Sequence, residues 1–86
     1  MRKEYTIIDE AGLHARPASL LVQEAAKFPN EITIEYSGRR LTLKSIMAVM
    51  SLGVPQGATI AIEVEGDNQS TVFAALEKVL VTHQLI

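Results

Sequence analysis

Hydrophobic residues recur along this chain with two different periods, and the changes of period divide it into seven segments. Alternation of apolar and polar residues, typical of strands with one buried face, predicts strands at about residues 2–8, 32–36, 40–43 and 59–65. Spacings of three and four residues, typical of amphipathic helices, predict helices at about 16–28 and 46–52, and a last one from a cap at Asn68 or Ser70 to about Leu80. The predicted order is therefore β-α-β-β-α-β-α.

The residues between these segments are those that turns and helix ends favour. Pro17 suits the first turn of a helix, where its missing N–H leaves no bond unmade. Ser37-Gly38 fits a two-residue hairpin turn, Ser45 is a good N-cap, and Gly53 a good helix stop. Since each strand has one apolar face, we expect an α+β domain in which a four-stranded antiparallel sheet carries three helices on one face.

Length and composition favour one small intracellular domain. The chain has 86 residues, 48% of them hydrophobic, which suffices for a single compact core. It contains no cysteine, so disulfides cannot support the fold, and its net charge of −2 gives no electrostatic reason to bind nucleic acid. No segment has the apolar run of a signal peptide or a membrane span, and we therefore expect a cytoplasmic protein.

One of the two histidines, His14, stands immediately before the first predicted helix. The free N–H groups and partial positive charge of a helix start bind anions and favour a neutral, nucleophilic imidazole. Arg16 adds a permanent cation, and Gly12 lets the backbone turn without a side chain in the way. These groups could hold a phosphoryl group, but the spacing also fits a capping or loop histidine. The other histidine, His83, is interpreted as a solvated or helix-end residue.

Two longer motifs resemble those of a known family. The segment Gly12-Leu13-His14-Ala15-Arg16-Pro17-Ala18 resembles the active-site motif of HPr, the histidine-containing phosphocarrier of the bacterial sugar phosphotransferase system. The segment Leu43-Lys44-Ser45-Ile46-Met47-Ala48-Val49-Met50-Ser51-Leu52-Gly53 resembles the second signature of that family, in the Gram-positive form with a regulatory serine. The resemblance covers essentially the whole chain as one HPr domain, and the predicted element order agrees with the family's open-faced β-sandwich.

The resemblance implies a phosphocarrier without enzymatic turnover or cofactor. His14 would accept phosphate on Nδ1 from phosphorylated enzyme I and pass it to a histidine of a sugar-specific enzyme IIA, while Arg16 would help to bind the phosphate. Ser45 would be phosphorylated by HPr kinase/phosphorylase with ATP, and that form would act as corepressor for the catabolite control protein. Ala48 departs from the glycine of many members and should slightly stiffen the second helix.

The second predicted helix is apolar on two sides, and only one side can face the core. We expect Val49 and Leu52 to be buried, which leaves Ile46, Met47 and Met50 partly exposed. Periodicity alone favours burial of the methionines, but the resemblance favours a docking patch around His14, because methionine adapts to several partners. The residues expected at this patch are Ala15, Leu20, Gln23, Lys27, Ile46, Met47 and Met50.

Other functions fit the sequence less well. A purely regulatory binding module, like the catabolite-repression relative of HPr, would lack the active histidine, and a carrier of the nitrogen-related system would lack the Ser45 segment. Two distant histidines without cysteine do not make a metal site. The glycines are not spaced as in a nucleotide-binding loop, so ATP is expected to bind a partner kinase. The family also implies a monomer, and the net charge and hydropathy predict no direct contact with nucleic acid and no insertion into a membrane.

Overall fold

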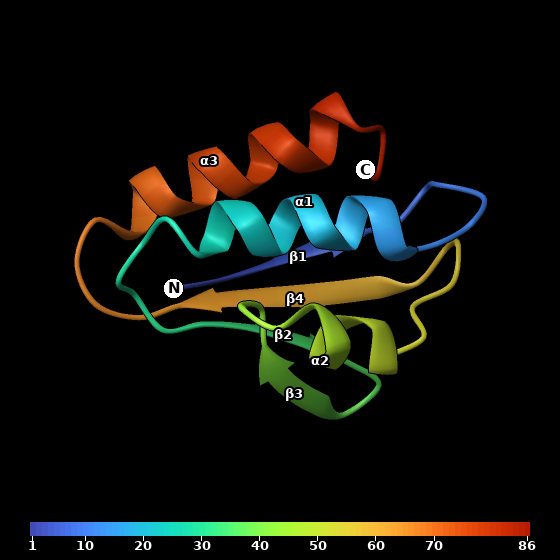
Figure 1. Cartoon of the computed structure of the whole chain (residues 1–86), viewed down its shortest axis with the longest axis horizontal. Helices are drawn as coiled ribbons and strands as arrows, with labels where there is room; N and C mark the ends of the chain where they lie inside the picture. Colours follow the sequence, from blue (N-terminus) through green and yellow to red (C-terminus); the bar gives the residue numbers. More distant parts are fainter.

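The computed structural model describes all 86 residues and has the predicted order of elements. The strands are β1 (Arg2–Thr6), β2 (Ile32–Tyr36), β3 (Arg39–Thr42) and β4 (Thr59–Val64), and the helices are α1 (Ala15–Ala25), α2 (Ile46–Ser51) and α3 (Gln69–Thr82). The strands form one antiparallel sheet in the order β1-β4-β2-β3, with the helices packed on one side (Figure 1). The predicted α+β open-faced sandwich is therefore confirmed.

A single apolar core fills the space between the helices and the sheet. Ile60 and Ile62 of the central strand β4 are fully buried, as are Leu21 of α1 and Leu76 of α3. No polar or charged side chain is buried. Since each large apolar side chain removed from water contributes about 2 kcal/mol, this core fixes the three helices firmly on the sheet.

The opposite face of the sheet is open and polar. Arg2 of β1 contacts Glu35 and Glu63 at 3.1 Å each, and Arg40 of β3 contacts Glu63 at 2.8 Å. These side chains remain partly exposed, so the pairs stabilise the sheet only slightly. The alternation of apolar and polar residues along the strands thus has the predicted cause, one buried face and one face in water.

The edge strand β1 is also attached to the helical layer. The hydroxyl of Tyr5 donates a hydrogen bond of 2.7 Å to Glu77 Oε2 on α3. Burial, and then this neighbouring carboxylate, raise the pKa of the Tyr5 hydroxyl well above its usual value. Lys3 lies over the ring of Phe73, 5.2 Å from its centroid.

None of the helices is both long enough and apolar enough to cross a lipid bilayer.

Some predicted element ends are wrong, because contacts outside the elements decide them. β1 ends at Thr6 and not at Ile8, whose N–H donates instead to the Leu85 carbonyl near the C-terminus. α1 ends at Ala25, and the chain reaches Phe28 through a tightened turn in which the Phe28 N–H donates to the Ala25 carbonyl.

The sequence predicts the turn between β2 and β3 more completely than it predicts the start of α3. The hairpin turn at Ser37 and Gly38 is confirmed, with φ of 53° and 81°, the signs of the turn that suits a two-residue hairpin. Asn68 occupies the N-cap position of α3, but its side chain makes no capping bond and its φ is 58°. Asn68, one of the two residues predicted as the cap, is therefore confirmed as the N-cap residue of α3, although it does not cap the helix with its side chain.

Candidate functional site

A tight loop between β1 and α1 holds His14 in place. Gly12 within it has a φ of +67°, and a Cβ atom there would lie only 2.1 Å from the carbonyl oxygen of Val54. The N–H of Leu13 donates to that same carbonyl at 2.9 Å, and the N–H of Gly12 donates to the Asp9 carbonyl at 2.9 Å. The backbone before His14 is therefore fixed against the turn that precedes β4, at a separation only glycine permits.

His14 is the N-cap residue of α1. Its backbone is extended, and its carbonyl accepts the first helical hydrogen bond, from the N–H of Ala18 at 3.0 Å. Its ring makes no capping bond, and its side chain is 42% exposed. The imidazole is thus free to react beside the unpaired N–H groups of the first helical turn.

The carboxylate of Asp9 lies at one edge of the His14 ring. Its Oδ2 is 3.5 Å from His14 Nε2, an ion-pair distance when the ring is protonated. Its Oδ1 accepts a 2.8 Å hydrogen bond from the N–H of Ala11, which is the bond of an Asx turn. Hydrophobic periodicity shows residues 9–12 only as a break between elements and does not predict that Asp9 contacts His14. The bond to the Ala11 N–H could have been predicted, because an aspartate at the start of a turn that contains glycine typically accepts such a bond.

His14 and Arg16 share a small pocket of about 200 Å³, lined by Asp9, His14, Arg16, Pro17, Leu20 and His83. Arg16 is exposed, and no ion pair of the structure engages its guanidinium. An anion bound beside His14 could therefore use that guanidinium as a bidentate donor.

His83 ends α3 as its C-cap residue, so its interpretation as a helix-end histidine is confirmed. The packing of α3 against α1 also brings it to the rim of the His14 pocket. The sequence carries no signal for this proximity, because it depends on how two helices far apart in the chain pack together.

Ser45 is the N-cap of α2, as predicted. Its Oγ accepts a 3.2 Å hydrogen bond from the N–H of Ala48. The preceding residue, Lys44, donates from Nζ to the carbonyl of Phe28 at 2.6 Å, which joins the start of α2 to the segment after α1. The Ser45 side chain is half-buried and therefore lies at the surface of a well-anchored helix start.

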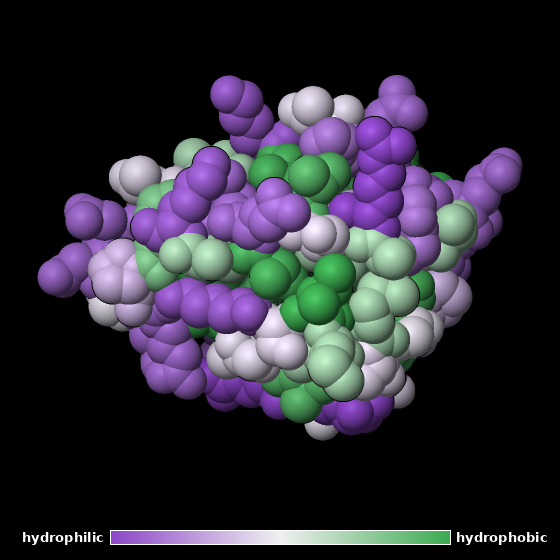
Figure 2. Space-filling model, in the orientation of Figure 1, coloured by the Kyte–Doolittle hydropathy of each residue, from purple (hydrophilic) through white to green (hydrophobic).

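The short helix α2 presents an apolar surface to solvent. Val49 and Leu52 are buried in the core, whereas Met47 is 81% exposed, Met50 40% and Ile46 39%. The predicted division of this helix is therefore confirmed. Figure 2 shows apolar surface gathered in the middle of the face on which α1 and α2 lie, with hydrophilic side chains around it. We call Leu20, Ile46, Met47 and Met50 the apolar patch.

The other residues expected at the patch are placed differently along α1. Ala15 is exposed at the first turn, next to His14. Gln23 donates to Ser19 Oγ at 3.2 Å. Lys27 lies beyond the end of α1 and pairs with Glu24 at 2.8 Å, and both line a shallow groove that faces α3. The structure thus brings Ala15 and Leu20 next to His14 and places Lys27 toward α3.

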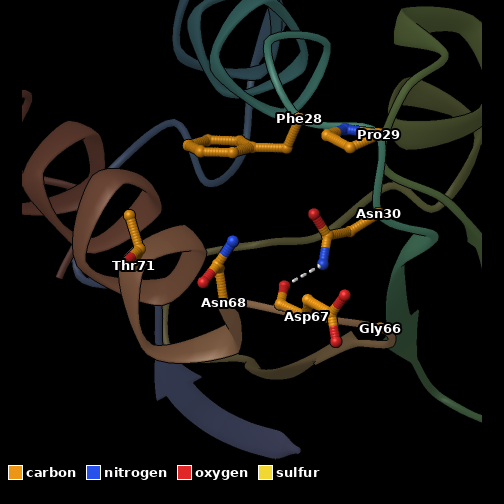
Figure 3. Close-up of a pocket in the computed structure, with 7 residues that line it drawn as sticks. All are labelled: Phe28, Pro29, Asn30, Gly66, Asp67, Asn68 and Thr71. Carbon is orange, nitrogen blue, oxygen red and sulfur yellow. Dashed lines mark hydrogen bonds between the residues drawn. The ribbon is translucent and has the colours of Figure 1, made fainter.

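The largest pocket, about 610 Å³, lies at the other end of α1 (Figure 3). It is lined by Phe28, Pro29, Asn30, Gly66, Asp67, Asn68 and Thr71. Asn30 Nδ2 donates to the carbonyls of Glu65 and Asp67 at 2.7 and 2.6 Å, so this amide closes two loops on each other. Of these two pockets, the smaller one is the better candidate, because it combines the nucleophilic His14 with the unpaired guanidinium of Arg16. No cluster of three or more His, Asp or Glu side chains is placed to hold a metal ion.

Known proteins are similar to this chain over nearly its whole length. The family model described as "PTS HPr component phosphorylation site" matches residues 1–82. A histidine-containing phosphocarrier protein from Mycoplasma is 37% identical, with a TM-score of 0.96, over 100% of this chain and 98% of its own. The phosphocarrier protein HPr of Bacillus anthracis is 39% identical, with a TM-score of 0.83, over 92% of this chain and 94% of its own.

A relative with a different description matches as well. Crh, described as the catabolite repression containing protein of Bacillus subtilis, is 31% identical, with a TM-score of 0.73. The match covers 93% of this chain and 92% of that one. Backbone shape alone therefore does not separate a carrier from a regulatory relative, and the side chains at residues 14 and 45 have to decide.

Proposed function

This chain belongs to the HPr family, the non-enzymatic phosphohistidine carriers of the bacterial phosphotransferase system, and we propose that it carries the phosphoryl group on His14. The donor would be phosphorylated enzyme I and the acceptor a sugar-specific enzyme IIA, the partners that the family implies. One observation carries the assignment. An exposed imidazole stands at the N-terminus of an eleven-residue helix, in the same pocket as an unpaired guanidinium.

The chemistry needs a lone pair, charge stabilisation and access. The Nδ1 lone pair of His14 attacks the phosphorus of the donor, a new N–P bond forms, and the donor's N–P bond breaks with its electron pair returning to the donor imidazole. Negative charge on the phosphoryl oxygens is stabilised by the N–H groups at the start of α1 and by Arg16. The second transfer, to enzyme IIA, runs through the same steps with His14 as the leaving group.

Incubation with enzyme I, magnesium and phosphoenolpyruvate tests the carrier role directly. Intact-mass measurement is expected to show a gain of one phosphate that is lost in acid, as expected of an N–P bond. The phosphate should then pass to enzyme IIA when that protein is added. No gain of mass, with enzyme I shown to be active on another carrier, would contradict the proposal.

We further propose that Ser45 is a regulatory phosphorylation site, served by HPr kinase/phosphorylase and recognised by the catabolite control protein. The support is its place at the surface as an N-cap, together with the resemblance of its segment to the family's serine signature. A phosphate there adds nearly two negative charges at a helix start, where they are favourable, so the fold should stay intact. Its effect would arise at interfaces, by repelling acidic partners and attracting arginine-rich ones.

A pair of nearly isosteric variants separates this charge effect from capping. Ser45→Asp and Ser45→Asn both retain an N-cap, so each should keep its stability to within about 0.5 kcal/mol. Only Ser45→Asp adds a negative charge, and it is expected to slow phosphoryl transfer from enzyme I several-fold. Stopped-flow transfer rates for both variants check this. Equal rates for the two would show that charge at this residue does not regulate docking.

The apolar patch is proposed as the surface on which the partners dock. Ile46, Met47 and Met50 remain exposed on α2, which the core holds in place, and the half-buried Leu20 of α1 also lines the His14 pocket. Exposed methionines supply apolar contact area that can adapt to different partners. Ala15 and Gln23, which are exposed on α1, would border this surface, and Lys27 would contact a partner only on the side toward α3.

Met47→Lys tests the docking role without disturbing the core. Because this side chain is 81% exposed, we expect stability within about 0.5 kcal/mol of wild type. The KM of enzyme I for the carrier should rise about tenfold, with kcat little changed, as for the loss of a central interface residue. Val81→Lys is the matched control, since Val81 is 60% exposed on α3 and outside the patch. An equal rise in KM for both variants would argue against a localised docking surface.

A further inference from the structure

The two oxygens of the Asp9 carboxylate do different things. Oδ1 is held by the N–H of Ala11, while Oδ2 faces His14 Nε2 at 3.5 Å. The backbone around Asp9 is also held by hydrogen bonds. The Asp9 carbonyl accepts from the N–H of Gly12, and the N–H of the preceding residue, Ile8, donates to the Leu85 carbonyl. The carboxylate is therefore held in place before the imidazole reacts, and its side chain is only 26% exposed.

We propose that Asp9 is a positioning residue for phosphoryl transfer: its carboxylate stabilises the His14 ring when that ring is phosphorylated on Nδ1 and protonated on Nε2. This inference rests on the proposed carrier role of His14. The carboxylate lies on the Nε2 edge, where it repels an anionic phosphoryl group and attracts a ring that bears a proton and a positive charge. A carboxylate that orients an imidazole and stabilises its cation acts in this way in other group-transfer sites.

The protonation state of the phosphorylated ring decides how easily the N–P bond breaks. In hydrolysis, a water oxygen attacks phosphorus, the N–P bond breaks, and its electron pair returns to Nδ1. From the Nε2-protonated ring the leaving group is neutral imidazole, and the water's spare proton goes to solvent. From the unprotonated ring the leaving group would be an imidazolate anion, which is far less stable. A carboxylate beside Nε2 therefore keeps the phosphoryl group labile to higher pH.

Two other charged groups face His14 from the helices packed around it. Arg16 of α1 is permanently cationic, and His83 at the end of α3 is cationic when protonated. Both would oppose the positive charge of the phosphorylated ring, whereas Asp9 is the one anionic group lining the pocket. The removal of its charge should therefore move the pH dependence in a defined direction.

The experiment is the hydrolysis rate of the phosphorylated chain as a function of pH, with phosphate introduced by enzyme I. In wild type the rate should fall with rising pH around a midpoint. In Asp9→Asn that midpoint is expected about half a pH unit lower, so that hydrolysis above it is about threefold slower. Asparagine retains an oxygen for the Ala11 N–H and so preserves the loop. Glu10→Gln, which neutralises the adjacent exposed carboxylate, is the matched control and should keep the wild-type midpoint.

A merely structural role for Asp9 would change stability but not this midpoint. Equal midpoints for wild type and Asp9→Asn, or equal shifts in Asp9→Asn and Glu10→Gln, would overturn the inference. NMR coupling between phosphorus and the ring nitrogens that places phosphate on Nε2 would overturn it as well. Asp9→Ser, whose hydroxyl can also accept from Ala11, should reproduce the shift if Asp9→Asn is unstable. If wild type accepts no phosphate at all, the carrier role fails and the inference falls with it.

Discussion

His14→Ala is expected to accept no phosphate from enzyme I, even at enzyme concentrations that phosphorylate wild type completely. The loss should be complete because the variant lacks the only imidazole at the start of α1, and neither Arg16 nor the helix N–H groups has a lone pair to attack phosphorus. Intact-mass measurement after incubation with phosphoenolpyruvate and enzyme I checks this. The fold should survive, since the His14 ring makes no capping bond and a stability change within about 0.5 kcal/mol is expected.

His83→Ala is the control that makes this result specific. Only two histidines are present, and both line the same pocket. His83→Ala should still gain one acid-labile phosphate, because its ring ends α3 and is not at the N-terminus of a helix. Phosphate on His14→Ala, or its loss from His83→Ala alone, would assign the carrier role to His83 instead.

The sequence predicts most of this fold because its signals are local. Ile60 and Ile62 alternate with polar residues, and that alternation specifies a strand with one buried face. Ser37-Gly38 specifies the hairpin turn through the backbone conformations that the pair tolerates. His14 and Ser45 were both predicted at helix starts, and Ser45 caps its helix by the expected bond. Each of these features depends on residues within four positions of each other.

What the sequence does not predict depends on distant contacts. His83 reaches the His14 pocket only because α3 packs against α1, and the same packing places Lys27 in a groove that α3 also lines. Asp9 is closer to His14 in the sequence than His83 is. Hydrophobic patterns nevertheless do not predict its contact with the His14 ring, because that contact is polar and lies within a loop. For the site, then, local patterns predict the reactive group and the adjacent cation, while a loop contact supplies Asp9 and the packing of the helices supplies His83.

Gly12→Ala is expected to destabilise the fold by about 3 kcal/mol or more, which corresponds to a fall in Tm of about 15 °C for a domain of this size. Two costs add. A left-handed residue with a side chain is strained at the observed φ of +67°. Its Cβ would also lie 2.1 Å from the Val54 carbonyl oxygen, a backbone atom that cannot rotate away. Thermal unfolding followed by circular dichroism measures the sum.

Gly53→Ala separates the clash from the strain. Gly53 has a similar φ of +61°, but a Cβ there would meet nothing within 4 Å. It should therefore cost only the conformational strain, about 1 kcal/mol. A similar Tm for the two variants would mean that the loop shifts at little cost. A larger fall in Tm for Gly12→Ala than for Gly53→Ala would instead show that the Val54 carbonyl, which also accepts from the Leu13 N–H, fixes the loop. Gly12→Ala should then also slow phosphoryl transfer, because the His14 ring lies two residues beyond the displaced backbone.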